Sequence, residues 1–456
     1  MSLFKKIIVC LVLLGVIGVG RAYADDDMSI LRDEETEQAL KTMITPIFKQ
    51  AGLSPDTVKF IIVQSNEMNA FVAGGQNIFL YTDLILKTDN PEELFGVIAH
   101  ETGHIADGHL FRGKMDMDHL STEAILSNLL GVAVAIAGRS PGAGTAISSA
   151  SDSVLTRTLL RHTRTQEGSA DRAGVRFLQG AGLPVTGLLS FMKKLESQEL
   201  IPETEQSEYV QTHPLTQDRV EALQHAVDEG PPGHTPPEWI ELHRRLKAKL
   251  LGYLFPDRSL QDTGAAPATQ YGHVVAWFRK NQPDKALATL DPLIKAEPNN
   301  PYFYELKGQI QYENGHIEDS IQSYSRAAEL APFSGLIRIA YAQSLLESKP
   351  ESHEKQNERL AEAIRQLNAA LDAEKQASEP HHMLAIAYGK QGQEGMSRLQ
   401  LAEEALLQNN AAFARREAQL ARVNLKKGTP AYQRAMDILD LVSQSDRGDN
   451  KSEKRD

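Results

Sequence analysis

The chain has 456 residues, a length that predicts two or three domains rather than one. Hydrophobic residues make up 41% and charged residues 24%, which is typical of a globular protein and excludes a fibrous or wholly disordered chain. Its net charge of -12 argues against a nucleic-acid-binding protein, and its single cysteine excludes intrachain disulfides and cysteine-rich zinc modules. Any metal site must therefore use His, Asp and Glu.

The first 24 residues have the pattern of an export signal. Lys5 and Lys6 precede the apolar run Ile7–Gly20, and Ala22-Tyr23-Ala24 forms a small-x-small cleavage site. The run has about 14 residues, fewer than the roughly 20 that span a membrane, which favours cleavage after Ala24 over an uncleaved anchor. We therefore expect an exported, soluble protein, periplasmic in a Gram-negative source; peripheral association with a membrane stays open.

The mature chain is predicted to be mainly α-helical with a small β-sheet. A helix is expected at Glu35–Ala51, and strands are expected at Val58–Val63 and Asn77–Tyr81. The later half is helical throughout. The predicted order is an α+β domain followed by an all-α repeat solenoid, with boundaries at 25–255 for the first domain, 256–270 for a polar linker, 271–444 for the repeats and 445–456 for a disordered tail.

The candidate chemistry lies at His100-Glu101-Thr102-Gly103-His104, on a helix predicted to begin at Asn90. Histidines four residues apart project from one helix face, so both imidazoles can reach one zinc ion. Glu101 then lies beside the metal, where it can accept a proton from a metal-bound water. Leu94, Ile98 and Ile105 are expected to form an apolar stripe on the opposite face.

A second acidic motif follows, with Glu167 and Asp171 on one face of a predicted helix. Glu167 can serve as the third zinc ligand, and Asp171 can accept a hydrogen bond from a zinc-bound histidine. Small residues keep this helix thin enough to approach the first one: Gly168, Ala170 and Gly174. The alternative is two solvent-facing histidines and an ordinary acidic surface, but the joint occurrence of both motifs favours one zinc site per chain.

Two further segments have open interpretations. The Gly-rich apolar stretch Leu129–Ala150 is either a lid over the cleft or an ordinary buried helical hairpin. The strand residues are candidates to pair with an extended substrate by strand addition: Asn77, Ile78, Phe79, Leu80 and Tyr81.

The second half shows a 34-residue period. Pro298 and Pro332 are 34 residues apart, and the repeat between them has the tetratricopeptide pattern of aromatic, glycine and alanine positions: Tyr304, Gly308, Tyr312, Gly315, Ser320, Tyr324 and Ala327. About four repeats are expected; a generic helical bundle is the alternative. Such solenoids present a concave surface to proteins or peptides.

Taken together, these motifs resemble the gluzincin-type metalloproteases that include the membrane CAAX prenyl proteases and the periplasmic BepA/YfgC-type proteins. The resemblance rests on five elements: Asn69-Ala70-Phe71, the Gly74-Gly75 turn, His100-Glu101-x-x-His104, Glu167-x-x-Ala170-Asp171, and Thr212-His213-Pro214 with Arg219. The BepA type matches in domain order as well. The resemblance implies a zinc endopeptidase and chaperone-like factor that acts on unfolded or misassembled outer-membrane β-barrel proteins. It also implies docking to the β-barrel assembly machinery through the repeats.

The resemblance places the His213 loop over the active site, and two roles stay open for this residue. His213 either occupies the fourth zinc position and holds the enzyme latent, or it stabilises the oxyanion of the tetrahedral intermediate. We favour the latch, because an exported protease without an obvious pro-segment needs restraint. Arg219 either positions the same intermediate or pairs with a carboxylate.

Two classes of function follow. One is a zinc-dependent protease with a docking domain, in which Glu101 is the general base. The other is a non-catalytic periplasmic repeat chaperone or scaffold with a structural zinc site. The intact Glu101 favours the protease, since a structural site has no need of a carboxylate at that position.

Overall fold

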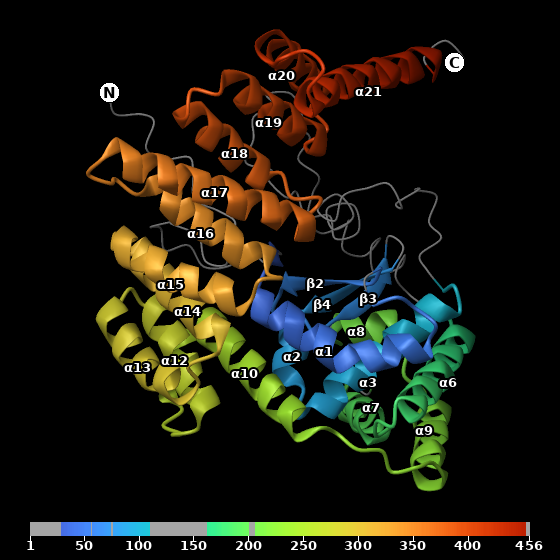
Figure 1. Cartoon of the computed structure of the whole chain (residues 1–456). Coiled ribbons are helices and arrows are strands. Elements are labelled where there is room, and N and C mark those ends of the chain that lie inside the picture. The colour runs from blue at the N-terminus through green and yellow to red at the C-terminus, as the bar shows by residue number, and fades with distance from the viewer. Residues whose placement is uncertain (1–28, 56, 74–75, 110–161, 200–205, 453–456) are drawn as a thin grey trace. The chain divides into compact units, whose positions relative to one another are not determined.

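The computed structural model describes residues 29–55, 57–73, 76–109, 162–199 and 206–452, and these divide into two compact units on either side of Ala276 and Trp277 (Figure 1). The predicted signal peptide, the Gly74-Gly75 turn and the Leu129–Ala150 segment lie outside the described residues. The predicted fold class is confirmed: the chain is mainly helical, with one small sheet and a series of repeat helices.

The sheet of the first unit has four strands in the order β1-β2-β4-β3. Strand β2 runs antiparallel to β1 and parallel to β4, and β3 runs antiparallel to β4. The two predicted strands are present, and two short strands that were not predicted flank them. The bounds are β1 Ser29–Leu31, β2 Lys59–Gln64, β3 Ala70–Ala73 and β4 Asn77–Tyr81.

The helices up to residue 254 share one continuous apolar core with this sheet. Helix α3 packs against α6 and α7, and α1 packs against α3, α6 and α10. The helices are α1 Glu34–Gln50, α2 Thr82–Lys87, α3 Pro91–Ala106, α6 Arg164–Gly180, α7 Thr186–Glu199, α8 Glu208–Thr212, α9 Gln217–Glu229, α10 Pro237–Leu254, α11 Pro256–Gln261 and α12 Pro267–Arg279.

The second unit is a run of helices in which each packs against the next, as the tetratricopeptide pattern predicts. Gly308 shows why the pattern needs glycine, because an added Cβ would lie 2.9 Å from the ring of Tyr324. The helices are α13 Pro283–Ala296, α14 Pro301–Glu313, α15 Ile317–Leu330, α16 Gly335–Glu347, α17 His353–Ala373, α18 Glu379–Lys390, α19 Glu394–Leu407, α20 Ala411–Asn424 and α21 Pro430–Ser452.

Two of the predicted boundaries differ from the structure. The segment 256–270, predicted as an irregular linker, contains α11 and the start of α12, and each helix begins at a proline. Proline fits the first helical turn because its fixed φ is already helical and its missing N–H would have no intrahelical acceptor there. Helix α21 continues to Ser452, past residue 445 where the disordered tail was expected. Among the described helices, none is both long and apolar enough to cross a bilayer.

Candidate metal centre

Helix α3 begins where the sequence predicts. The Asn90 side chain accepts a hydrogen bond from the Glu93 backbone N–H (2.9 Å), and Pro91 is the first helical residue. The expected apolar stripe of Leu94, Ile98 and Ile105 is buried in the core, and so is every other residue from Glu93 to Ile105. A helix packed by α1, α6 and α7 and by strand β3 has no solvent face. His100 and His104 therefore point into the interior.

Helices α3 and α6 approach closely through small residues. A Cβ added to Gly103 would lie 2.6 Å from the Ala170 carbonyl oxygen, and one added to Gly174 would lie 3.2 Å from the backbone of Ala99. Gly168 does not contribute, since its added Cβ would meet only the end of the Arg172 side chain. This contact brings Glu167 beside the two histidines.

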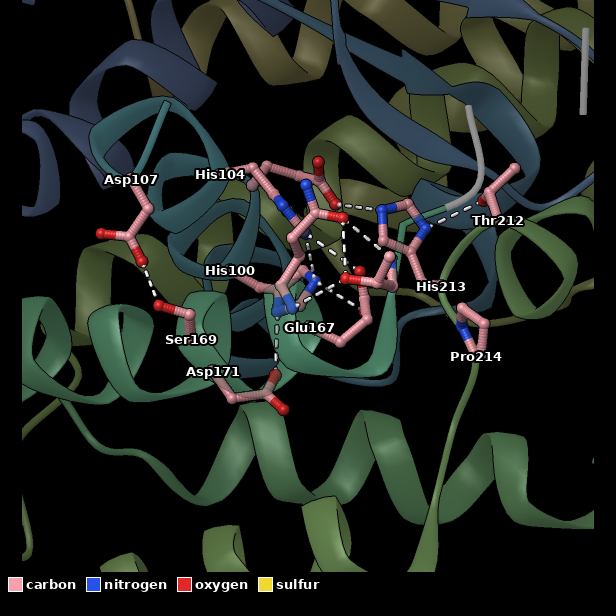
Figure 2. A network of polar contacts seen from close by, with 12 residues as sticks. His100, His104, Asp107, Glu167, Ser169, Asp171, Thr212, His213 and Pro214 are labelled. Carbon is pink, nitrogen blue, oxygen red and sulfur yellow. Dashed lines mark hydrogen bonds and ion pairs between the residues drawn. The ribbon is translucent and has the colours of Figure 1, made fainter. Parts of the chain in front are cut away.

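Four buried side chains converge at this place: His100, His104, Glu167 and His213 (Figure 2). Their candidate ligand atoms all lie within 4.8 Å of one another. The Nε2 atoms of His100 and His104 are 3.1 Å apart, and Glu167 oxygens lie 3.4 Å and 3.2 Å from them. Ligands of a tetrahedral zinc, at about 2.0–2.2 Å from the ion, lie about 3.3–3.6 Å from one another. The three measured distances agree with this range to within about 0.2 Å, so the three side chains fit such an ion.

Asp171 and Arg219 support this group from α6 and α9. His100 Nδ1 donates to Asp171 Oδ1 (2.9 Å), which leaves Nε2 facing the other ligands. Arg219 donates to both oxygens of Asp171 (2.6 and 2.9 Å) and to the Pro214 carbonyl (2.8 Å), and its Nη1 lies 2.8 Å from Glu167. Arg219 therefore pairs with the carboxylates of Asp171 and Glu167, which is one of the two roles predicted for it.

Neighbouring cations and hydrogen bonds keep the buried carboxylates of Asp171 and Glu167 ionised. Burial would raise the pKa of Asp171, but hydrogen bonds from Arg219 and His100 outweigh it and lower that pKa. Burial likewise opposes ionisation of Glu167, yet the neighbouring histidines hold its pKa well below the ordinary value. Burial would lower the pKa of His100, but its two carboxylate partners raise it to about 10. A metal ion must therefore displace a proton from this group.

His213 enters from the loop after α8, and its Nδ1 faces the Thr212 hydroxyl. The Thr212 hydroxyl donates to the backbone carbonyl of Glu208 (2.9 Å) and lies 2.9 Å from His213 Nδ1. A hydroxyl has one proton; when that proton goes to the carbonyl, Nδ1 donates to the hydroxyl oxygen and Nε2 keeps its lone pair. Nε2 has no hydrogen-bond partner in the described chain, and the ring stacks on Tyr209 with centroids 4.5 Å apart.

Glu101 is fully buried, and neither of its carboxylate oxygens has a hydrogen-bond partner in the part of the chain that the structure describes. Its Oε1 lies 3.5 Å from His213 Nε2. Burial raises the pKa of Glu101 to about 8. An unsatisfied buried carboxyl is costly to the fold, and such groups occur where function requires them.

Three residues at the centre were not predicted from the sequence. His162 stacks on His104 with ring centroids 3.9 Å apart, His109 lies edge-on to His104 at 5.4 Å, and Tyr209 stacks on His213. Burial lowers the pKa of His162 to about 4. None of these residues belongs to a motif at fixed spacing, so only their contacts reveal them.

The predicted substrate strand is wrong. Strand β4, with Asn77, Ile78, Phe79, Leu80 and Tyr81, lies between β2 and β3 and pairs with both, so it has no free edge for another chain. The strand next to α3 is β3, which pairs with β4 on one side only among the described strands. The hydrophobic character of β4 reflects its central position in the sheet.

The fold and this centre define a peptidase-type metal-binding domain joined to helical repeats. Residues 34–227 match the family model described as Peptidase family M48, and residues 272–335 match the tetratricopeptide repeat. The chain thus has a peptidase M48 domain followed by tetratricopeptide repeats.

The chain is similar to the beta-barrel assembly-enhancing protease of Escherichia coli strain K12, with 26% identity over 312 residues that cover 66% of this chain and 63% of the relative. The same-named protein of Yersinia pestis is 26% identical over 62% of this chain and 59% of its own length. Metalloprotease LoiP of Escherichia coli strain K12 is 29% identical over 38% of this chain and 64% of its own length. The match spans less than two thirds of each relative.

Proposed function

We propose that this chain is a zinc-dependent endopeptidase. The observation that carries the proposal is the convergence of His100, His104 and Glu167 at ligand spacing beside a buried, unpartnered Glu101. Two imidazoles and one carboxylate are a typical ligand set of catalytic zinc. A structural zinc site has no use for the additional buried carboxyl.

His100, His104 and Glu167 would hold the zinc, which would lower the pKa of a bound water to about 7 and polarise the scissile carbonyl. Glu101 would accept a proton from the attacking water and later deliver it to the leaving amine. Its place supports this role, because the carboxyl is fully buried beside the candidate ligands and has no hydrogen-bond partner among the described residues. Asp171 keeps the His100 ring oriented, and Arg219 neutralises the carboxylates behind it.

We assign His213 as a fourth ligand that restrains activity rather than as an oxyanion donor. An oxyanion donor needs a proton on Nε2, which a neutral ring lacks when its Nδ1 donates to Thr212; Nδ1 and the Thr212 hydroxyl lie 2.9 Å apart, which supports the ligand role. His213 offers one ring nitrogen to the group of candidate ligand atoms that lie within 4.8 Å of one another. Release of His213 would open the position that water and substrate need.

Strand β3 replaces β4 as the substrate strand in this proposal. Extended peptides add to a sheet through a free strand edge. The residue two before β3, Met68, accepts a hydrogen bond from the backbone N–H of Tyr209 (3.0 Å), so the start of this edge lies beside the helix that leads to His213. All four residues of β3 are buried, so substrate pairing requires this edge to be uncovered.

We further propose that the chain is exported to the periplasm after cleavage at Ala24, where it acts on unfolded or misassembled outer-membrane β-barrel proteins. The similarity to beta-barrel assembly-enhancing proteases supports this substrate class. The tetratricopeptide helices supply a surface suited to binding the assembly machinery or its clients.

A second candidate is a non-catalytic repeat chaperone with a structural zinc. The presence of four candidate ligands favours it, since closed four-ligand sites are typical of structural zinc. The two functions differ in their response to loss of the fourth ligand. A structural site loses stability, whereas a latched enzyme gains activity.

The test is to measure zinc content and hydrolysis of an unfolded outer-membrane β-barrel protein by the purified full-length chain. We expect one zinc per chain and cleavage that stops when a chelator removes the metal. Zinc binding without any cleavage, in wild type and in His213→Ala alike, would favour the chaperone.

A further inference from the structure

The three buried histidines of the metal centre are held in different ways. Metal-binding histidines usually donate their second ring nitrogen to a neighbouring group, which fixes the orientation of the ring. His100 Nδ1 donates to Asp171, and His213 Nδ1 hydrogen-bonds with the Thr212 hydroxyl. His104 differs, because its Nδ1 is buried and has no hydrogen-bond partner in the described chain. Its orientation must come from another contact.

A flat ring lies against His104 in place of a hydrogen bond. The imidazole of His162 stacks on it with centroids 3.9 Å apart and an angle of 22° between the planes. His109 also touches His104, but at 5.4 Å and 64°, so it contacts the ring only with its edge. A parallel contact restricts tilting of a ring, whereas a single edge contact leaves that motion open.

The backbone holds His162 in place. Its N–H donates to the Thr212 carbonyl (3.0 Å), and the next residue, Thr163, caps helix α6 with reciprocal hydrogen bonds to Gln166. His162 is therefore fixed between the loop that carries His213 and the helix that carries Glu167. Its ring centroid lies 5.3 Å from that of His213.

We propose that His162 is a positioning residue that orients His104 for metal binding by stacking on its ring. The proposal rests on the proposed zinc site, but not on the proposed hydrolysis. His162 acts on His104 and not on the ion, since it is absent from the group of candidate ligands within 4.8 Å of one another. A flat side chain of any polarity can therefore replace it.

The experiment compares zinc affinity of the full-length chain carrying His162→Phe, His162→Leu or His162→Ala, with His109→Ala as the matched control. The dissociation constant is measured by competition with a chromophoric chelator, and the visible spectrum of the Co²⁺-substituted protein reports ligand geometry. Leucine fills space without a flat face, so it remains informative if the alanine variant does not fold.

We expect His162→Leu and His162→Ala to bind zinc about 10-fold more weakly, on the scale of lost support for a metal ligand, and to alter the Co²⁺ spectrum. The dissociation constants of His162→Phe and His109→Ala for zinc should stay within about 2–3-fold of the wild-type value, well below the roughly 10-fold loss expected for the other two variants. Equal weakening by Phe and Leu would overturn stacking and indicate that an imidazole nitrogen is needed. Wild-type affinity in the Leu variant would also overturn it, as would equal weakening by His109→Ala. Hydrolysis is assayed separately, so loss of the proposed activity leaves this result interpretable.

Discussion

Replacing Gly103 by alanine should disrupt the metal centre without touching a ligand. The added Cβ would lie 2.6 Å from the carbonyl oxygen of Ala170 and 2.9 Å from its Cα. Ordinary contact begins at 3.4 Å, so helix α6 must shift by about 0.8 Å. Metal–ligand distances tolerate only about 0.2 Å. Glu167 lies on the shifted helix and should leave coordinating range of His100 and His104.

The cost to folding follows from the same contact. Overpacking of a rigid core typically costs about 1–3 kcal/mol, which for a unit of this size lowers Tm by about 2–12 °C. We therefore expect Gly103→Ala to unfold earlier, to bind zinc at least 10-fold more weakly on the scale of lost ligand support, and to hydrolyse substrate poorly. Thermal unfolding with and without zinc measures the change in Tm, and competition with a chelator measures the change in zinc affinity.

Gly168→Ala is the matched control. It lies on α6, and its added Cβ meets only the flexible end of Arg172 at 3.5 Å. Alanine is preferred over glycine inside a helix, so this variant should be unchanged or more stable by up to about 1 kcal/mol. If Gly103→Ala kept wild-type Tm and zinc affinity, the close approach of α3 and α6 would not be what positions Glu167.

The other predictions concern the charged groups around the centre. Asp171→Asn should weaken zinc binding by about 10–100-fold in chelator competition, because the anionic partner of His100 is lost. Arg219→Met leaves two buried carboxylates without their cation and should cost the metal-free protein about 3–5 kcal/mol in denaturant unfolding. Burial raises the pKa of Glu101 in the folded protein from 4.5 to about 8, so its contribution to stability is complete below pH 4.5 and is lost as the pH rises to 8. The Tm of metal-free wild type should therefore fall over this pH range relative to that of Glu101→Gln. His213→Ala should raise basal proteolysis and self-cleavage, seen by electrophoresis over time; activity below wild type would contradict the latch.

The convergence of the candidate ligands His100 and His104 was predictable because their signal is local. A four-residue spacing on a helix places His100 and His104 on one face whatever the surrounding fold. The Asn90 cap and Pro91 gave the start of that helix for the same reason. Repeats were predictable too, since a 34-residue period is visible in the chain itself.

What could not be predicted depends on contacts between distant segments. The amino acids of β4 suit an edge strand and a central strand equally well. Its central position is visible only from its pairing with β2 and β3. Strand β3 is a run of four residues, too short for a periodic pattern. His162 lies 58 residues from His104, on whose ring it stacks, so no spacing rule identifies it. Tyr209 lies only four residues before His213, but that spacing alone does not predict that the two rings stack.

The central claim is that Glu101 serves as the proton-transferring base beside a zinc ion that other residues hold. The most direct measurement compares zinc content and hydrolysis of an unfolded outer-membrane β-barrel protein between wild type and Glu101→Gln. We predict equal zinc content and a loss of hydrolysis of about 100-fold or more, because the change leaves the ligands intact and removes proton transfer. Loss of zinc from the variant, or hydrolysis at the wild-type rate, would contradict the assignment.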